Sequence, residues 1–258
     1  MAVRALAARA YFGLCRALGS LLRAGRYSTA SVVEEGGARR VRKHRRDYAP
    51  LLVWMGGLLV RLLHTGVRVL PQREWEAQER RIYQSLHGIA IRVDADGTLI
   101  LPCLPGETLA SLLDDRALAA TARTNAITCA VVALSEFHRR GFTHGDAMAE
   151  NVLVDLGAGV AHWFDFETAH DPRRPDAWRR ADDVRALLAT CLLRTGPEQV
   201  AVTIDLIVGV YHDEAVTRRL STSFGSVFQR PLAFHLAQAG LSFRRFEQIG
   251  RLLNARGE

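Results

Sequence analysis

The sequence predicts an α+β fold in two lobes, with a small antiparallel sheet in the amino-terminal lobe and mainly helices in the carboxy-terminal lobe. In two stretches, residues 25–43 and 89–101, apolar and polar residues alternate on both sides of a turn sequence, which indicates hairpins. Apolar residues at helical spacing dominate from residue 118 onward. The chain has 258 residues, of which 48% are hydrophobic, so it can bury the core of one large domain or the cores of two lobes that share a cleft.

Residues 1–24 form a separate basic segment. Arg9, Arg16 and Arg23 recur every seven residues opposite an apolar side, which predicts a basic amphipathic helix, and the first acidic residue is Glu34. With a net charge of +7 and a pI near 9.8, the chain favours an anionic partner. Three interpretations stay open for this helix: docking on an anionic membrane surface, packing on the domain, or targeting. Nucleic acid is disfavoured as a partner, because aromatic residues do not alternate with the basic residues and no known nucleic-acid-binding motif is present.

The amino-terminal lobe is expected over residues 25–102, with an apolar insert over 50–70. In residues 25–43 a Glu-Glu-Gly-Gly turn separates two alternating runs, which predicts a hairpin of edge strands. The insert contains LLVWMGGLLV at residues 51–60, which is too short and interrupted to span a bilayer. It is either a buried helix or a membrane-facing patch, and the buried form is the more common one.

A helix is expected over residues 71–88 (PQREWEAQERRIYQSLHG). Trp75, Ile82 and Leu86 share one face of it, and Gly88 ends it. Glu79 lies inside this apolar stripe, so we expect a cation beside it. Glu76, one turn earlier, is the alternative, although it does not share that face.

The carboxy-terminal lobe is expected over residues 103–258. PCLPGETLASLL, at residues 102–113, begins with two prolines that disfavour a central strand and continues into a helix capped by Thr108 or Glu107. A long helix over residues 118–140, a hairpin around residues 155–159 and further helices from about residue 182 follow.

The four cysteines are scattered without a CxxC pair or a close histidine partner. They are Cys15, Cys103, Cys129 and Cys191. This spacing argues against a structural zinc site and against a disulfide-rich secreted fold, so we expect a reducing, cytoplasmic environment, with peripheral attachment to the inner face of a membrane as a possibility.

Polar groups concentrate in two short stretches, GFTHGDAMAENVLVD at residues 141–155 and FDFE at residues 164–167. Asp146 is suited to orient and deprotonate a hydroxyl, and Asn151, five residues later, to offer an amide oxygen to Mg²⁺. Asp165, after the next strand, is suited to bridge the metal and phosphates. We expect His144 to be a structural donor rather than a catalytic group. Glu167 is either a helper in metal binding or a surface carboxylate.

HGDAMAEN followed by FDFE resembles the catalytic and metal-binding loops of the protein-kinase-like superfamily. The HGD variant is closer to lipopolysaccharide (Kdo) kinases, aminoglycoside phosphotransferases and other atypical kinases than to eukaryotic protein kinases. The resemblance extends over about residues 25–193. It implies a two-lobed kinase-like fold and an ATP- and Mg²⁺-dependent transfer of phosphate to a hydroxyl, with Asp146 as the catalytic base and with Asn151 and Asp165 as metal ligands.

The same resemblance assigns the nucleotide site. Lys43 resembles the third-strand lysine that contacts the α- and β-phosphates, with Arg42 and Arg40 as competitors, and Glu79 resembles its partner on the helix. Residues 101–106 resemble the hinge, which places Leu101 and Cys103 beside the nucleotide. Either of two adjacent aspartates resembles the buried residue that braces the catalytic loop; these are Asp182 and Asp183.

The sequence departs from the family in three places. GRYSTA, at residues 25–30, has one glycine where the phosphate loop usually has three. An APE-like segment is missing, and Met148 replaces the lysine that follows the catalytic aspartate in many serine/threonine kinases. These departures favour a sugar, lipid, lipopolysaccharide or other small-molecule acceptor. A serine/threonine protein kinase and a catalytically inert pseudokinase that serves as a binding module are the alternatives.

Overall fold

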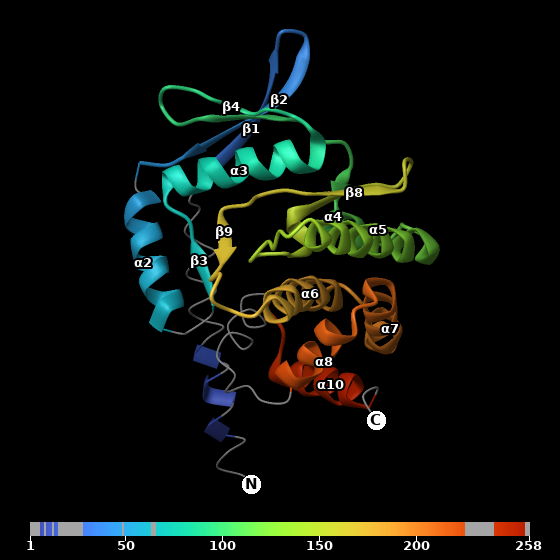
Figure 1. Ribbon diagram of the computed structural model, residues 1–258. Coiled ribbons are helices and arrows are strands. Elements are labelled where there is room, and N and C mark those ends of the chain that lie inside the picture. Colours follow the sequence, from blue (N-terminus) through green and yellow to red (C-terminus); the bar gives the residue numbers. More distant parts are fainter. Residues whose placement is uncertain are drawn as a thin grey trace.

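The computed structural model describes residues 28–47, 49–62, 66–224 and 240–255, with a few helical positions between residues 6 and 14. The fold is mixed, with small antiparallel sheets and many helices, which confirms the predicted α+β class at this level (Figure 1). The sheets come mainly from the first part of the chain, and the last part is helical. Of the predicted basic helix over residues 1–24, residues 6, 7, 9–11, 13 and 14 are described and are helical; the other residues lie outside the described part, so the full helix stays a prediction.

The largest sheet has four strands in the order β1, β2, β5, β4. These strands are β1 (Ser28–Glu35), β2 (Ala38–Arg45), β4 (Arg92–Val93) and β5 (Leu99–Pro102). Between β1 and β2 the chain turns at Gly36 and Gly37, whose φ angles of 60° and 76° suit glycine. On the other edge of β2, Lys43 lies opposite Leu99 of β5. Both predicted hairpins are confirmed, but the expectation of two edge strands in the first is wrong for β2, which pairs with β1 on one side and β5 on the other.

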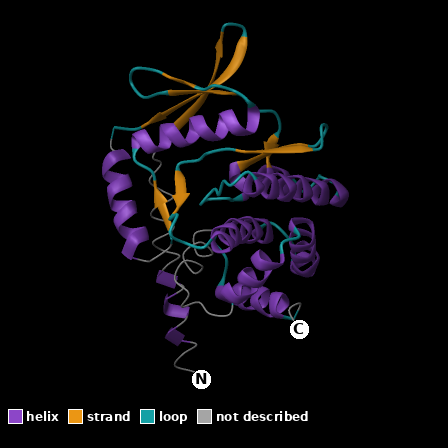
Figure 2. Cartoon of the chain, viewed as in Figure 1, coloured by secondary structure: helices purple, strands orange, loops and turns teal. Residues whose placement is uncertain are grey.

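Helix α3 (Gln72–His87) lies along one face of this sheet (Figure 2). Its buried residues are Trp75, Glu79, Ile82 and Tyr83, and it ends at Gly88, whose φ of 65° is left-handed. The helix expected over residues 71–88 is therefore confirmed, including the position of Glu79 within the apolar stripe. Only Leu86 differs, because it is partly rather than fully buried.

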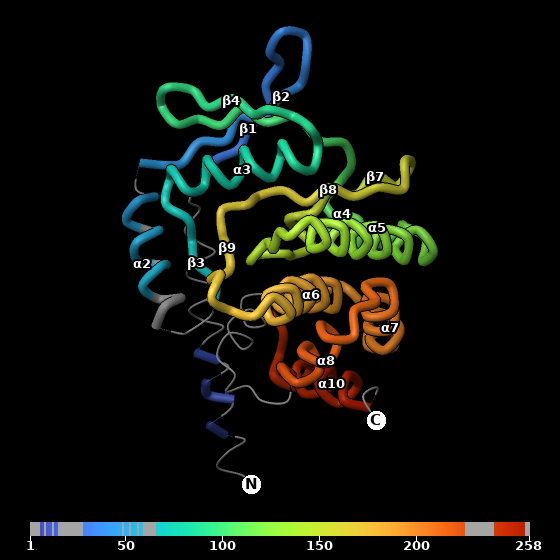
Figure 3. The backbone as a smooth tube through the Cα atoms, viewed as in Figure 1, coloured from blue at the N-terminus to red at the C-terminus, as the bar shows by residue number. Residues whose placement is uncertain are grey.

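Helix α2 (Ala49–Leu62) contradicts the expectation that the apolar run at residues 51–60 is buried. Leu51, Trp54, Met55 and Leu58 are 59%, 66%, 51% and 47% exposed. The reason is the position of α2 at the side of the fold, where it lies next to β3 (Val67–Val69) and where no described residue covers this face (Figure 3). Among the helices of the described ranges, none has the length and apolar character needed to span a membrane.

The remaining elements form a small sheet and a stack of helices below α3 (Figure 3). The sheet is β6 (Glu107–Thr108), β7 (Val152–Asp155) and β8 (Val160–Trp163), with the short helix η1 (Ala149–Asn151) before β7. The other helices are α4 (Leu109–Asp114), α5 (Ala120–Arg139), α6 (Asp176–Leu193), η2 (Pro197–Gln199), α7 (Val200–Tyr211), α8 (Glu214–Ser223) and α10 (Phe243–Asn254).

Local signals explain most of these boundaries. Thr108 caps α4, because its hydroxyl accepts a hydrogen bond from the Ser111 N–H at 3.1 Å, so Thr108 rather than Glu107 is the cap. The long helix expected over residues 118–140 is α5, and the hairpin around residues 155–159 joins β7 to β8. Helix α6 begins at Asp176, directly after Pro175, which is six residues earlier than expected.

One strand pair was not foreseen from the sequence. Strand β9 (Thr168–His170), directly after FDFE, pairs antiparallel with β3, which directly precedes α3. Backbone bonds on either side extend the pair, from the Leu70 N–H to the Glu167 carbonyl at 2.9 Å and from the Asp171 N–H to the Gly66 carbonyl at 2.8 Å. The segment after FDFE is therefore fixed to the insert.

Candidate functional site

The site is centred on Lys43, which is 6% exposed on β2. Its Nζ lies 3.4 Å from Glu79 Oε1 and 3.0 Å from Glu167 Oε1, and it also contacts Asp165 Oδ1. These carboxylates come from α3 and from the loop after β8, so three distant parts of the chain meet at one ammonium group. Its neighbour Arg42 points the other way, as strand alternation requires, and its side chain is 48% exposed.

Glu79 is fully buried on α3 and is held from two sides. Its Oε1 accepts hydrogen bonds from Trp75 Nε1 at 3.0 Å and from the Phe166 N–H at 3.3 Å. Glu76 instead accepts from Gln72 within α3 and does not reach the site. The geometry therefore selects Glu79 as the partner of Lys43.

Burial and charge oppose each other in this cluster. Burial alone would lower the pKa of Lys43, but Asp165, Glu79 and Glu167 outweigh it and raise that pKa above its ordinary value. Burial raises the pKa of Glu79, although Lys43 acts in the opposite direction. Burial alone would raise the pKa of Asp165, but the contact with Lys43 holds that pKa below its ordinary value. Even with the nearby Arg45 counted, three carboxylates outnumber two cations, so the cluster favours a further cation.

Asp165 adopts a strained backbone conformation. Its φ is 68°, in the left-handed region that residues other than glycine rarely occupy. The surroundings enforce this bend, because the Phe166 ring is buried and stacks on Phe137 at 5.5 Å. From α3, Gln78 Nε2 donates to the Phe166 carbonyl at 3.0 Å and to the Thr168 carbonyl at 2.8 Å. Such enforced strain is typical of functional sites.

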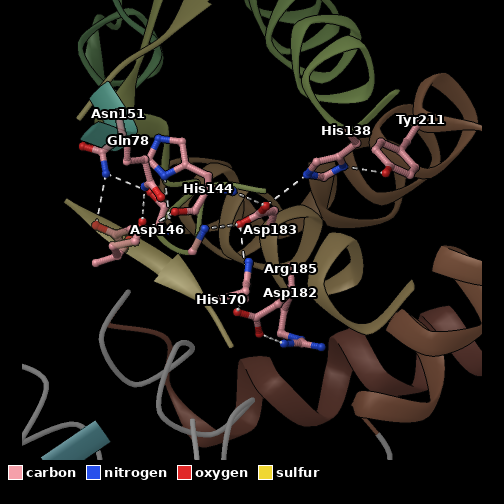
Figure 4. Close-up of polar contacts among 12 residues, drawn as sticks. Gln78, His138, His144, Asp146, Asn151, His170, Asp182, Asp183, Arg185 and Tyr211 are labelled. Carbon is pink, nitrogen blue, oxygen red and sulfur yellow. Dashed lines mark hydrogen bonds and ion pairs between the residues drawn. The ribbon is translucent and has the colours of Figure 1, made fainter. Parts of the chain in front are cut away.

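The loop that begins with His144, Gly145 and Asp146, called the HGD loop below, forms the second part of the site (Figure 4). Asn151 Nδ2 donates to the Asp146 carbonyl at 2.8 Å and to Asp146 Oδ2 at 3.1 Å, which leaves the amide oxygen of Asn151 for another partner. His144 joins this loop to FDFE: its Nδ1 accepts from the Asp146 N–H at 3.3 Å, and its Nε2 donates to the Phe164 carbonyl at 2.9 Å. Burial lowers the pKa of His144, so the neutral ring serves as a structural bridge.

Asp183 on α6 braces the HGD loop from below. It is 1% exposed and accepts hydrogen bonds from the His144 N–H at 2.7 Å and the Gly145 N–H at 2.8 Å. Asp182 faces another group, with its Oδ2 3.2 Å from His170 Nε2. Of the two aspartates left open by the sequence, the structure selects Asp183. The loop itself requires Gly145, whose φ is 79° and whose added Cβ would lie 3.1 Å from Thr168 Oγ1.

Several supporting residues were not found from the sequence. His138 on α5 bridges Tyr211 Oη at 2.6 Å and Asp183 Oδ2 at 3.0 Å, and Gln78 holds the FDFE segment as described above (Figure 4). His138 and Asp183 are 45 positions apart in the chain, and no spacing in the sequence connects them. Only the packing of α5, α6 and α7 brings them together.

The expected hinge residues lie at the end of β5, one of the two inner strands of the large sheet. Leu101 is 5% exposed on β5 opposite Val41, and Cys103, two residues later, is partly exposed. Of the expected phosphate loop, Ser28 begins β1, while residues 25–27 lie outside the described part of the chain. The nucleotide contacts of Leu101 and Cys103 stay predictions.

The donor set fits Mg²⁺ bound together with phosphate. The side chain of Asp165 is 37% exposed, so its carboxylate is accessible, and the Asn151 amide oxygen is not used by the contact with Asp146. Within the described residues, no group of three or more acidic, histidine or cysteine side chains is arranged to hold a metal on its own. Mg²⁺ in proteins usually takes one or two carboxylates and completes its shell with waters and phosphate oxygens.

Comparison with known proteins adds no identification. No protein-family model matches the chain, and no curated protein sequence matches it significantly.

Proposed function

We propose that this protein is an ATP- and Mg²⁺-dependent phosphotransferase with a two-lobed, protein-kinase-like fold, in which residues 25–102 and 103–258 form the lobes. The proposed acceptor is a hydroxyl of a sugar, a lipopolysaccharide or other lipid, or another small molecule. The observation that carries this proposal is the meeting of Lys43, Glu79 and Asp165 beside the loop that joins Asp146 to Asn151. Phosphoryl transfer requires such positioned charges and little covalent chemistry.

Each residue then has a defined role. Lys43, held by Glu79, would leave the contact with Asp165 and bind the α- and β-phosphates of ATP. Asp165 and Asn151 would hold Mg²⁺, which when bound neutralises phosphate charge. Asp146, oriented by the Asn151 amide, would accept the proton of the acceptor hydroxyl as its oxygen attacks the γ-phosphorus and ADP leaves. Phosphate then forms an ester with the acceptor oxygen.

The segment after FDFE supports a small acceptor. Only a short stretch separates Asp165 from the start of α6 at Asp176, and β9 within it is paired with β3. A peptide that binds by extended backbone contacts needs a free strand edge or loop here. The paired segment offers less of both, so a protein acceptor for a serine/threonine kinase is the less favoured alternative.

A catalytically inert pseudokinase that binds a partner is the second candidate. One observation favours it: Lys43 contacts Asp165 directly, and Glu167 also occupies its ammonium group. A nucleotide must displace both contacts before it can bind as proposed.

Two measurements separate these candidates. If the protein is a transferase, a thermal-shift titration with ATP and Mg²⁺ should raise its Tm. The variant Asp165→Ala should lose this rise. The control Glu198→Ala, which changes a carboxylate on η2 outside the site, should keep it. No shift in the wild-type protein favours the inert scaffold. A transfer assay with γ-labelled ATP against lipid, small-molecule and protein fractions should label one fraction in the wild type only; equal label with Asp146→Ala would contradict the proposed base.

Peripheral membrane attachment is proposed for the same protein. The basic segment at residues 1–24 and the exposed apolar face of α2 together offer cations for an anionic lipid surface and apolar side chains for its interior. Attachment would place a lipid-linked acceptor near the site.

A further inference from the structure

Helix α3 presents two adjacent polar side chains to different parts of the site. Glu79 faces Lys43, with its Oε1 3.4 Å from Nζ. Gln78 is partly buried, lies about 100° away around the helix, and faces the backbone of the FDFE segment. Its Nε2 donates to the Phe166 carbonyl at 3.0 Å and to the Thr168 carbonyl at 2.8 Å. One helix therefore contacts both the buried lysine and the segment that carries the proposed metal ligand.

The backbone from Phe166 to Thr168 is held from two sides. The carbonyls of Phe166 and Thr168 point to Gln78 on α3, whereas the Glu167 carbonyl between them accepts from the Leu70 N–H at 2.9 Å, directly after β3. This alternation is the pattern of an extended chain. The Thr168 hydroxyl also donates to a carbonyl of the HGD loop at 3.1 Å, so the segment is tied to that loop as well.

This support acts on Asp165, the residue immediately before the held segment. Its φ of 68° is unfavourable for a residue other than glycine and persists only where neighbouring contacts enforce it. The next residue, Phe166, is bound at both ends of its backbone by α3: its N–H donates to Glu79 Oε1 at 3.3 Å, and its carbonyl accepts from Gln78. Without the Gln78 amide, the backbone at Asp165 could relax toward an ordinary conformation and carry the carboxylate with it.

We propose that Gln78 is a positioning residue for Mg²⁺, which holds Asp165 in the conformation that binds the metal. Gln78 acts through the backbone after Asp165 and not as a ligand. This inference rests on the proposed function, because it assigns Mg²⁺ to Asp165. Since Glu79 on the same helix holds Lys43, α3 sets the positions of both the metal ligand and the lysine.

The test is calorimetric titration of the full chain with ATP, once with excess Mg²⁺ and once with a chelator in place of the metal. Gln78→Met removes both donated hydrogen bonds and keeps the length of the side chain. We expect it to weaken ATP binding about tenfold in Mg²⁺, as when one or two ordinary hydrogen bonds no longer support the metal ligand. Without Mg²⁺ its affinity for ATP should stay within about twofold of the wild-type value.

A control and a milder variant make the test specific. Gln84→Met makes the same change at an exposed position of α3 and should leave both affinities unchanged. Gln78→Asn has an amide on a side chain that is one methylene shorter, so it cannot keep both hydrogen bonds at their present lengths. It should weaken ATP binding in Mg²⁺ about threefold, and it decides the question if Gln78→Met does not fold.

Amide hydrogen exchange tests the same support without nucleotide. Exchange at residues 166–169 should be faster in Gln78→Met than in the wild type and in Gln84→Met, because the backbone loses two of its hydrogen bonds to α3. Unchanged exchange would overturn the role of Gln78 whether or not ATP binds.

The titrations separate a failure of this inference from a failure of the proposed function. If the wild type binds ATP more tightly with Mg²⁺ and Gln78→Met keeps the whole of that gain, the role of Gln78 is overturned and the proposed function stands. Equal losses with and without Mg²⁺ would also overturn it, since they indicate a general structural role. A wild-type protein that binds no ATP under either condition would overturn the proposed function itself.

Discussion

Replacing Lys43 with methionine tests the charge arrangement on which the site depends. The variant removes the ammonium that Glu79, Glu167 and Asp165 share, and leaves the first two carboxylates buried, with side chains 0% and 10% exposed. Asp165, at 37%, is screened by water and adds little. Breaking a buried pair costs about 3 to 5 kcal/mol, so we expect a loss of about 3 kcal/mol in the free energy of unfolding at neutral pH.

Urea unfolding at several pH values measures this loss. With a slope of about 2 kcal/mol per molar urea, the midpoint should fall by about 1.5 M at pH 7. Without Lys43, burial raises the folded-state pKa of Glu79 further, so the folded variant binds protons that the unfolded chain releases above about pH 4.3. The stability of the variant should therefore fall as pH rises from about 4 to 7, and its gap to the wild type should widen.

Arg42→Met is the matched control for this experiment. Arg42 is the next residue on the same strand, its side chain is 48% exposed, and its contact with Asp94 is 3.8 Å long, so we expect a change within about 0.5 kcal/mol. If Lys43→Met costs no more than Arg42→Met, or if its cost does not depend on pH, the buried carboxylates do not need this cation and the reasoning fails.

Three further predictions concern the loop, its brace and the exposed helix. Gly145→Ala should lower the free energy of unfolding by about 1 to 3 kcal/mol in thermal unfolding, because Gly145 has a positive φ. Gly209→Ala, in helix α7 with open space around it, should leave the protein equally stable or stabilise it. Equal effects of the two changes would exclude backbone strain at Gly145. Asp183→Asn should lower the Tm and speed amide exchange of the HGD loop, since a carboxylate accepting two backbone N–H bonds is lost; unchanged exchange would show that another group braces the loop. A double change of Leu51 and Trp54 to serine should weaken sedimentation with anionic vesicles without changing the Tm, and unchanged sedimentation would remove α2 from the proposed membrane surface.

Local patterns predicted most of the elements. The Glu-Glu-Gly-Gly turn indicated the first hairpin, because glycines tolerate positive φ, and the position of Glu79 in the apolar stripe of α3 indicated a buried carboxylate with a cation beside it. The same reasoning was wrong for α2. Apolar composition alone does not tell whether a helix has partners on every side, and the side chains of Leu51, Trp54, Met55 and Leu58 on α2 are exposed in the described part of the chain.

Long-range pairings were beyond the reach of local patterns. Strands β3 and β9 have three residues each and lie about one hundred positions apart, too short to give a period. The choice between Asp182 and Asp183 depends on which carboxylate the turn of α6 directs at the HGD loop.

The sequence by itself determined where strands, turns and helices form and which residue types are available for the chemistry, because backbone preference and apolar period act over a few neighbouring residues. The tertiary structure alone decided which of those groups lie in contact: Lys43 with its three carboxylates, and the HGD loop with Asp183. Contacts between segments distant along the chain depend on the mutual packing of whole elements, and the free energy of burying each charge is set there.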